Sequence, residues 1–184
     1  MVDAVSDVSA SNFSQLTDHS SNSDNSTFNH RYFSNSKYSS GSQIHFLYVE
    51  GANGADPTKI GDEIYPIVAL AKSVGATLWL LEHRFYGQSR PFVRLYNKNL
   101  PYLTSQQAVE DIAAFINAQN AASGKSNPRW VLFGSAYSGA LALWFRTKYP
   151  NLCVGAVASS PLISLEVDNY RECLEIAYTD SACI

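Results

Sequence analysis

Short apolar runs alternate with longer, helix-like segments along most of this chain. Four apolar runs of strand length occupy residues 44–49, 76–84, 129–133 and 153–160. Three expected helices fill the intervals, at 61–75, 104–122 and 138–149. This alternation is typical of an α/β protein with a mostly parallel sheet, and the near-continuous apolar strands indicate that helices cover both of its faces.

Local signals mark the start of two of these helices. Thr104 is followed three residues later by Gln107, a spacing that predicts a capping box at the start of the longest helix. Pro66 falls inside the first expected helix, where it either kinks the helix or moves its start.

The composition excludes several classes of function. The 184 residues are 46% hydrophobic and 16% charged, with a net charge of −3, which indicates a globular chain large enough for a core. No run of Lys or Arg offers the basic surface that nucleic acid needs. No apolar stretch is long enough to span a membrane, and the N-terminal residues lack the pattern of a signal peptide.

The three cysteines lack the spacing of metal ligands, so neither a metal nor a cofactor is predicted. Cys153 opens an apolar run and is expected to be a core thiol. Cys173 and Cys183 either form a small disulfide with each other or each pair with a cysteine beyond residue 184.

The N-terminal part is polar. Residues 1–27 are rich in Ser, Asn and Asp and poor in aliphatic side chains, which predicts a flexible arm. Residues 27–40 then alternate aromatic and polar side chains, which favours an edge strand or a hairpin. Glycosylation sequons begin at Asn12 and Asn25, and they matter only if the chain enters a secretory compartment.

The third apolar run enters its helix through a turn of small residues, in the stretch WVLFGSAYSGALALWF at 130–145. A hydrolase holds its nucleophile on such a strand–turn–helix, where bulky neighbours would clash. Sites on parallel sheets form at the carboxyl ends of strands, so this turn and the loop at 50–54 make up the expected site. The amino end of the helix would direct backbone N–H groups at an oxyanion there.

Three long segments make the chain resemble the serine exopeptidases that include lysosomal Pro-Xaa carboxypeptidase, dipeptidyl peptidase II and thymus-specific serine protease. They are FNHRYF at 28–33, EHRFYGQSRPF with NLPYLTSQQAVEDIAAFI across 82–116, and the whole stretch 130–162. The resemblance implies an α/β-hydrolase fold with a helical insertion and a Ser–Asp–His triad. It also implies peptide substrates cleaved next to proline or a small residue, and an extracellular, vesicular or lysosomal location.

Composition and the resemblance together divide the chain into three parts. Residues 1–27 would be the polar arm, 28–165 a partial α/β-hydrolase domain, and 166–184 the truncated start of the helical insertion. Whether the parent activity removes C-terminal residues or N-terminal dipeptides stays open, because both occur in the family.

Aligned with the family, the turn carries an alanine where the family has its nucleophilic serine. Tyr137 and Gly139 match the end of the family pattern, which places Ala136 at the nucleophile position, and a methyl group cannot form an acyl-enzyme. Two substitutes are weighed against this alignment. Ser138 is expected to bond locally at the helix start, and Ser135 would need the turn to shift by one residue.

The oxyanion and elbow region is expected to comprise Gly51, Gly134, Tyr137 and Gly139. Glu50 stands where the family usually has a glycine. All four histidines precede the turn, and the family's triad Asp and His would lie beyond the last residue. The chain as given is therefore expected to be catalytically incompetent, with no intact catalytic residue.

The alternative function belongs to another class. A non-catalytic relative would keep the scaffold to bind proline-containing peptides or a protein partner, and a homodimer is left open. Deliberate replacement of the nucleophilic serine by alanine would explain Ala136, but it would not explain the presence of Ser135 beside it.

Glu82, His83 and Arg84 form a motif at the end of the second apolar run. A functional interpretation makes His83 a base or a ligand, but its position in the chain differs from that of the triad histidine. We therefore expect the three side chains to bond to the neighbouring loop and fix the fold near the site. Arg84 is expected to pair with a carboxylate or to bind carbonyl groups.

Overall fold

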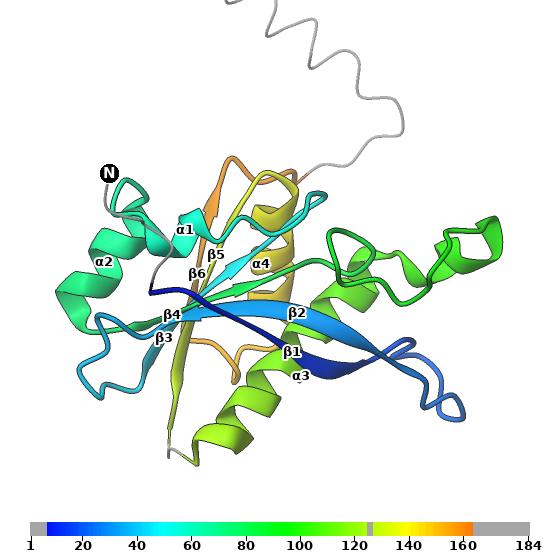
Figure 1. Ribbon diagram of the computed structural model, residues 1–184, viewed down its shortest axis with the longest axis horizontal. Coiled ribbons are helices and arrows are strands. Elements are labelled where there is room, and N and C mark those ends of the chain that lie inside the picture. Colours follow the sequence, from blue (N-terminus) through cyan, green and yellow to red (C-terminus); the bar gives the residue numbers. More distant parts are fainter. Residues whose placement is uncertain (1–6, 125–126, 164–184) are drawn as a thin grey trace, which may run out of the picture.

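The computed structural model describes residues 7–124 and 127–163, which are built around one six-stranded sheet (Figure 1). The strands lie in the order β1-β2-β4-β3-β5-β6. β2 pairs antiparallel with β1 and β4, whereas the pairs among β3, β4, β5 and β6 are parallel. The strands are β1 (Ser9–Leu16), β2 (Thr27–Asn35), β3 (Ile44–Val49), β4 (Thr77–Leu81), β5 (Arg129–Ser135) and β6 (Gly155–Ser159).

Helices cover both faces of this sheet, as the apolar strands predict. α3 (Ser105–Ser123) and α4 (Tyr137–Lys148) pack on one face, and α1 (Thr58–Gly61) and α2 (Pro66–Val74) on the other (Figure 1). Successive strand residues enter opposite layers, because side chains alternate along a strand. On β3, for example, Phe46 joins the α2 layer and Leu47 joins the layer of α3 and α4.

Both helix-start signals correspond to real helix ends. Pro66 is the first residue of α2, so it sets the start of the helix rather than kinking it. Thr104 caps α3 and accepts a hydrogen bond from the backbone N–H of Gln107 at 3.2 Å. The reciprocal bond of a capping box is replaced, since the Gln107 amide bonds instead to Asp18 Oδ1 and to the His19 N–H.

The expectation of a flexible arm at residues 1–27 is wrong for residues 9–16, which form a strand of the sheet. Ser9–Leu16 forms β1 and pairs along its whole length with Thr27–Ser34 of β2. Strand pairing uses backbone groups, so a Ser- and Asn-rich segment can still join a sheet. Phe13 packs against the apolar layer of α3, and Gln15 is 1% exposed. β1 is therefore the sheet edge, and β2 is an internal strand in a hairpin with it.

Of the expectations about the C-terminal part and the cysteines, one lies outside the described residues and one can be tested. The insertion expected at 166–184, with Cys173 and Cys183, lies outside them. Cys153 is described, and it is 3% exposed and not in a disulfide, so it is a core thiol. Within residues 7–124 and 127–163, no helix is long and apolar enough to cross a membrane.

Candidate active site

A single residue separates β5 from α4, and its backbone is strained. Ala136 has φ 52° and ψ −121°, a conformation that residues with a side chain rarely adopt. Sheet and helix hold it there: the Ala136 N–H donates to Ser159 O at 2.9 Å, and its carbonyl accepts from the Ala140 N–H at 3.1 Å. The turn thus has an exposed apex at Ala136, between an apolar strand and the amino end of a helix.

The small residues around the apex are explained by the close approach of strand and helix. A Cβ added to Gly134 would lie 2.3 Å from the Ser138 carbonyl oxygen, which no real structure tolerates. A Cβ on Gly139 would lie 3.3 Å from the Gly134 carbonyl oxygen, a tighter contact than most. Larger side chains at these positions would push α4 away from β5, and the turn would open.

Ser138 makes local hydrogen bonds, as expected. It is 4% exposed, and its hydroxyl donates to Ser135 O and accepts from the Ser135 N–H, both at 2.9 Å. The hydroxyl therefore closes the turn beneath the apex instead of facing solvent. Ser135 is exposed, but it is the last residue of β5, with ordinary strand pairing to Ser159.

The loop after β3 lies directly against the turn. A Cβ on Gly51 would be 3.7 Å from Ser138 Cβ and 3.7 Å from Tyr137 Cδ1, which is ordinary contact. Glu50, at the position where the resemblance leads us to expect a glycine, is 2% exposed and is bound by the Lys59 ammonium at 2.8 and 2.9 Å. Its carboxylate is therefore neutralised within the scaffold.

His83 contacts the turn through Tyr137. Its Nε2 lies 3.2 Å from the Tyr137 hydroxyl, and its Nδ1 lies 2.7 Å from Arg84 O. Because a carbonyl can only accept, Nδ1 carries the proton and Nε2 accepts from the tyrosine. Burial lowers the pKa of His83, and burial with a smaller effect of Tyr86 raises the pKa of Tyr137 to about 12. Both side chains are neutral at pH 7, and the histidine braces the tyrosine.

Glu82 organises the loop that follows β4. Its carboxylate accepts from the backbone N–H groups of Ala55, Gln88 and Ser89, and it is paired with Arg31. Burial alone would raise the pKa of Glu82, but these hydrogen bonds outweigh it and hold the pKa below its usual value. Close packing at this carboxylate also excludes any side chain at Gly87, where φ is 56°.

Arg84 makes both kinds of contact expected of it. Its Nε and Nη2 bind the two oxygens of Asp111 at 2.6 Å each, and its Nη1 donates to Thr17 O and Tyr102 O at 3.0 Å. The two side chains of this ion pair are 0% and 2% exposed. Burial alone would raise the pKa of Asp111, but hydrogen bonds from Arg84 and His19 outweigh it and lower the pKa.

The structure gathers some of the predicted residues and separates others. Eight of the predicted residues meet at the turn, at one end of the sheet. These residues are Gly51, His83, Gly134, Ser135, Ala136, Tyr137, Ser138 and Gly139. Glu82 and Arg84 point into separate networks. Asn12 and Asn25 are exposed, on β1 and in the turn after it.

Sequence reasoning missed Asp111, although the sequence carries a signal for it. It is an acidic residue on the face of α3 that also presents Ala108, Ile112 and Phe115, all buried. An acid in that position needs a buried cation as its partner.

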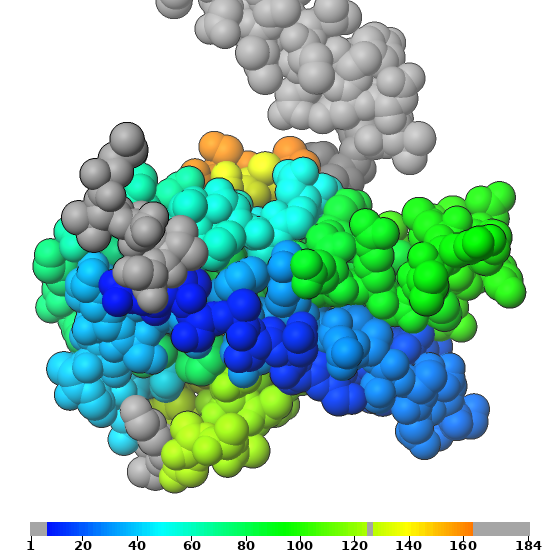
Figure 2. Space-filling view, viewed as in Figure 1, coloured from blue at the N-terminus to red at the C-terminus, as the bar shows by residue number. Residues whose placement is uncertain are grey.

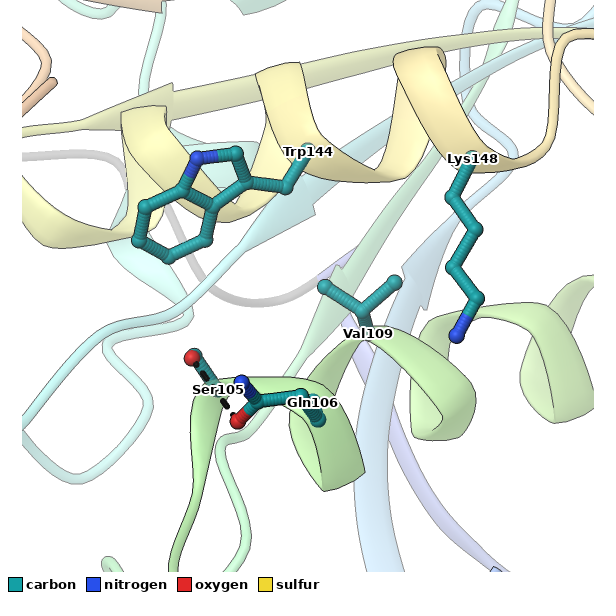
Figure 3. A pocket seen from close by; sticks show the side chains of 5 residues that line it. All are labelled: Ser105, Gln106, Val109, Trp144 and Lys148. Atoms are coloured by element: carbon teal, nitrogen blue, oxygen red, sulfur yellow. Dashed lines mark hydrogen bonds between the residues drawn. The ribbon is translucent and has the colours of Figure 1, made fainter.

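A separate groove lies between α3 and α4, away from the turn. Its volume is about 400 Å³, and Figure 3 shows Val109 and Trp144 facing it from the two helices. None of the residues predicted for the site lines it, so the groove is not the candidate active site. The lining residues are Ser105, Gln106, Val109, Trp144 and Lys148.

The sheet order, the strained turn and the helices on both faces define an α/β-hydrolase fold. Solved α/β hydrolases support this class: a peroxisomal enzyme of Saccharomyces cerevisiae superposes with a TM-score of 0.61 at 12% identity, covering 87% of this chain and 46% of that chain. GrgF of Penicillium gives 0.58 at 20% identity, covering 95% and 54%. The chain belongs to the serine carboxypeptidase S28 family, whose profile matches residues 15–182.

Named relatives agree with this assignment. Thymus-specific serine protease of Mus musculus is 40% identical over 151 residues, covering 79% of this chain and 29% of the relative. Lysosomal Pro-X carboxypeptidase of Homo sapiens is 35% identical over 152 residues, covering 80% and 30%. The chain therefore spans about a third of the length of the curated relatives that it matches.

Proposed function

We propose that this chain carries the nucleophile elbow of a serine exopeptidase with Ala136 at the nucleophile position, and that the chain does not itself hydrolyse peptide bonds. One observation carries the proposal: the strained apex conformation, with φ 52° and ψ −121°, belongs to Ala136. An elbow nucleophile needs that exposed apex, and the methyl group of alanine cannot attack a carbonyl.

The neighbouring serines do not replace the missing nucleophile. The Ser138 hydroxyl is buried and makes two hydrogen bonds to the backbone of Ser135, so attack would first require the turn to break. Ser135 is part of β5 and lacks the apex geometry. His83 does not supply a base for either serine, because its Nε2 accepts a hydrogen bond from the Tyr137 hydroxyl instead.

Parts of a peptide site persist around the apex. The first N–H groups of α4 have no partner within the helix and carry its positive dipole end, which suits a peptide carbonyl or carboxylate. The loop at Gly51 lies beside them. Since relatives include a Pro-X carboxypeptidase, the second candidate function is non-catalytic binding of proline-containing peptides.

One peptide experiment tests both the proposed lack of hydrolysis and the non-catalytic binding of proline-containing peptides. The full chain is incubated with a proline-containing peptide and with a matched peptide in which alanine replaces the proline. We expect no new peptide termini by mass spectrometry, and the binding function predicts tighter binding of the proline peptide in calorimetry. Cleavage that disappears in Ser138→Ala or Ser135→Ala would overturn the proposal of incompetence, and equal or absent binding would remove the binding function.

We also propose the extracellular, vesicular or lysosomal location that the resemblance implies, and a lysosomal Pro-X carboxypeptidase among the relatives supports the lysosomal setting. Asn12 and Asn25 are both exposed, so an oligosaccharide transferase could reach them on the folded chain or before folding. Chain expressed in a secretory system would then lose mass on enzymatic deglycosylation, and Asn12→Gln with Asn25→Gln would abolish that loss. Unchanged mass would argue against this location.

A further inference from the structure

The connection between β4 and α3 is basic in an otherwise acidic chain. Arg90, Arg94 and Lys98 lie in it, and no Asp or Glu occurs from residue 83 to 109, although the chain as a whole has a net charge of −3. All three cations are exposed. Within the described residues, none of them forms an ion pair.

Large apolar side chains stand exposed between these cations. Val93 is 96% exposed, Leu95 is 62% exposed and Tyr96 is 51% exposed. Figure 2 shows this green segment extending outward from the body of the molecule. The order along the chain alternates, with apolar residues at 92–93 and 95–96 between cations at 90, 94 and 98.

The segment is held in shape rather than merely extended. Asn99 is 6% exposed, and its side chain donates to Arg94 O at 3.1 Å while its backbone N–H donates to Tyr96 O at 2.8 Å. At the base, Phe92 packs against Tyr102, whose carbonyl is bound by Arg84. These contacts fix the loop from within, so its exposed apolar groups are presented without a large ordering cost.

We propose that residues 90–100 are a docking surface for an anionic lipid membrane. Cations attract the negative leaflet, and an aliphatic tip with a tyrosine beside it enters the interface between headgroups and acyl chains. Long Arg and Lys side chains keep their charges among the headgroups while their stems cover apolar surface.

The observations favour a lipid surface over a protein partner. A specific protein partner would have to match this segment in shape and in the placement of its negative charges. This segment has only positive charges, and its most exposed apolar residue, Val93, is flanked by Pro91-Phe92 and Arg94. A membrane needs no matching pattern of charges, only proximity.

Vesicle binding tests the proposal on the full chain. The chain is mixed at low salt with vesicles of phosphatidylcholine alone, and with vesicles in which about a third is phosphatidylserine. We expect binding only to the anionic vesicles, and release when the salt is raised. Arg94→Gln with Lys98→Gln should lower the partition coefficient about 25-fold, at about fivefold for each charge. Val93→Ser with Leu95→Ser should also weaken binding.

A matched double variant separates the docking surface from overall charge. Lys37→Gln with Lys72→Gln removes two exposed cations elsewhere, and it should bind anionic vesicles much as the unaltered chain does. Equal losses in the two double variants, no binding at low salt, or equal binding to neutral vesicles would each overturn the proposal. Binding to polyglutamate but not to anionic vesicles would overturn it in favour of an acidic protein partner.

Discussion

At the scale of single residues, the backbone of residue 136 is the most informative feature of the chain. A side chain at φ 52° and ψ −121° costs of order 1–3 kcal/mol, and such strain persists where surrounding bonds enforce it. Here the enforcing bonds come from β6 and α4. The bonds from β6 and α4 therefore hold a strained turn at a residue whose methyl side chain has no reactive group.

That strain predicts the effect of a glycine. Ala136→Gly should raise the free energy of unfolding by about 1 kcal/mol, since relief of strain exceeds the added entropy of the unfolded chain. Urea denaturation measures it. Ala140→Gly, one turn into α4, is the matched control and should lower stability by about 1 kcal/mol or more. Equal losses in both variants would mean that residue 136 is unstrained.

Ser138 gives a second prediction at this scale. Ser138→Ala removes the hydroxyl that both donates to and accepts from the backbone of Ser135, so it should lower the free energy of unfolding by about 1–2 kcal/mol. Ser135→Ala deletes an exposed hydroxyl and should change stability by less than about 0.5 kcal/mol. Similar effects of the two substitutions in chemical denaturation would contradict the buried role of Ser138.

At the scale of elements, α3 is tied to the sheet and to the N-terminal segment by a buried charge. Arg84 follows β4, Asp111 lies on α3, and Gln15 and His19 come from β1 and the residues after it. One carboxylate thus joins three parts of the chain that are far apart in sequence. This explains why a polar N-terminal segment is ordered.

Breaking that ion pair should be costly. Asp111→Asn leaves the Arg84 guanidinium buried without a counter-charge, so we expect a loss of about 3–5 kcal/mol in the free energy of unfolding. Glu110→Gln, the neighbouring residue on α3, removes a partly exposed pair with Lys148 and should cost less than about 1 kcal/mol. Equal effects in thermal or urea denaturation would show that burial of the charge does not matter.

The sequence predicts these elements to different degrees. The alternation of apolar runs and helical periods yields the parallel part of the sheet, because those segments bury their own side chains. β1 could not be predicted from composition, since its order comes from backbone pairing and from Gln15 and His19 bonding to Asp111. The elbow could be located from its small residues, but the enclosure of Ser138 depends on the close contact of Gly134 with α4.

At the scale of the whole molecule, buried ionisable groups make stability depend on pH. Burial lowers the pKa of His30 and of His83, so the unfolded chain binds more protons than the folded chain as pH falls below about 6.5. Stability is present above that pH and is lost progressively below it. The lowered pKa values of Glu82 and Asp111 extend the loss below about pH 4.

The histidine contribution can be isolated by substitution. Between pH 7.5 and 5.5 the unaltered chain should lose up to about 1.4 kcal/mol of unfolding free energy for each buried histidine that stays neutral. His30→Phe fills the stacked position between Phe13 and Phe28 and should flatten this slope by about that amount. An unchanged slope in urea titrations at the two pH values would show that His30 does not titrate differently on folding.

The central claim, that the elbow apex lacks a nucleophile, is tested most directly by the mass of the intact chain after treatment with a fluorophosphonate. An active serine hydrolase in the same tube shows that the reagent works. We predict no adduct on the unaltered chain, since Ala136 has no hydroxyl and the Ser138 hydroxyl is buried and bonded to Ser135. A stoichiometric adduct that peptide mapping places on Ser135 or Ser138 would contradict the account.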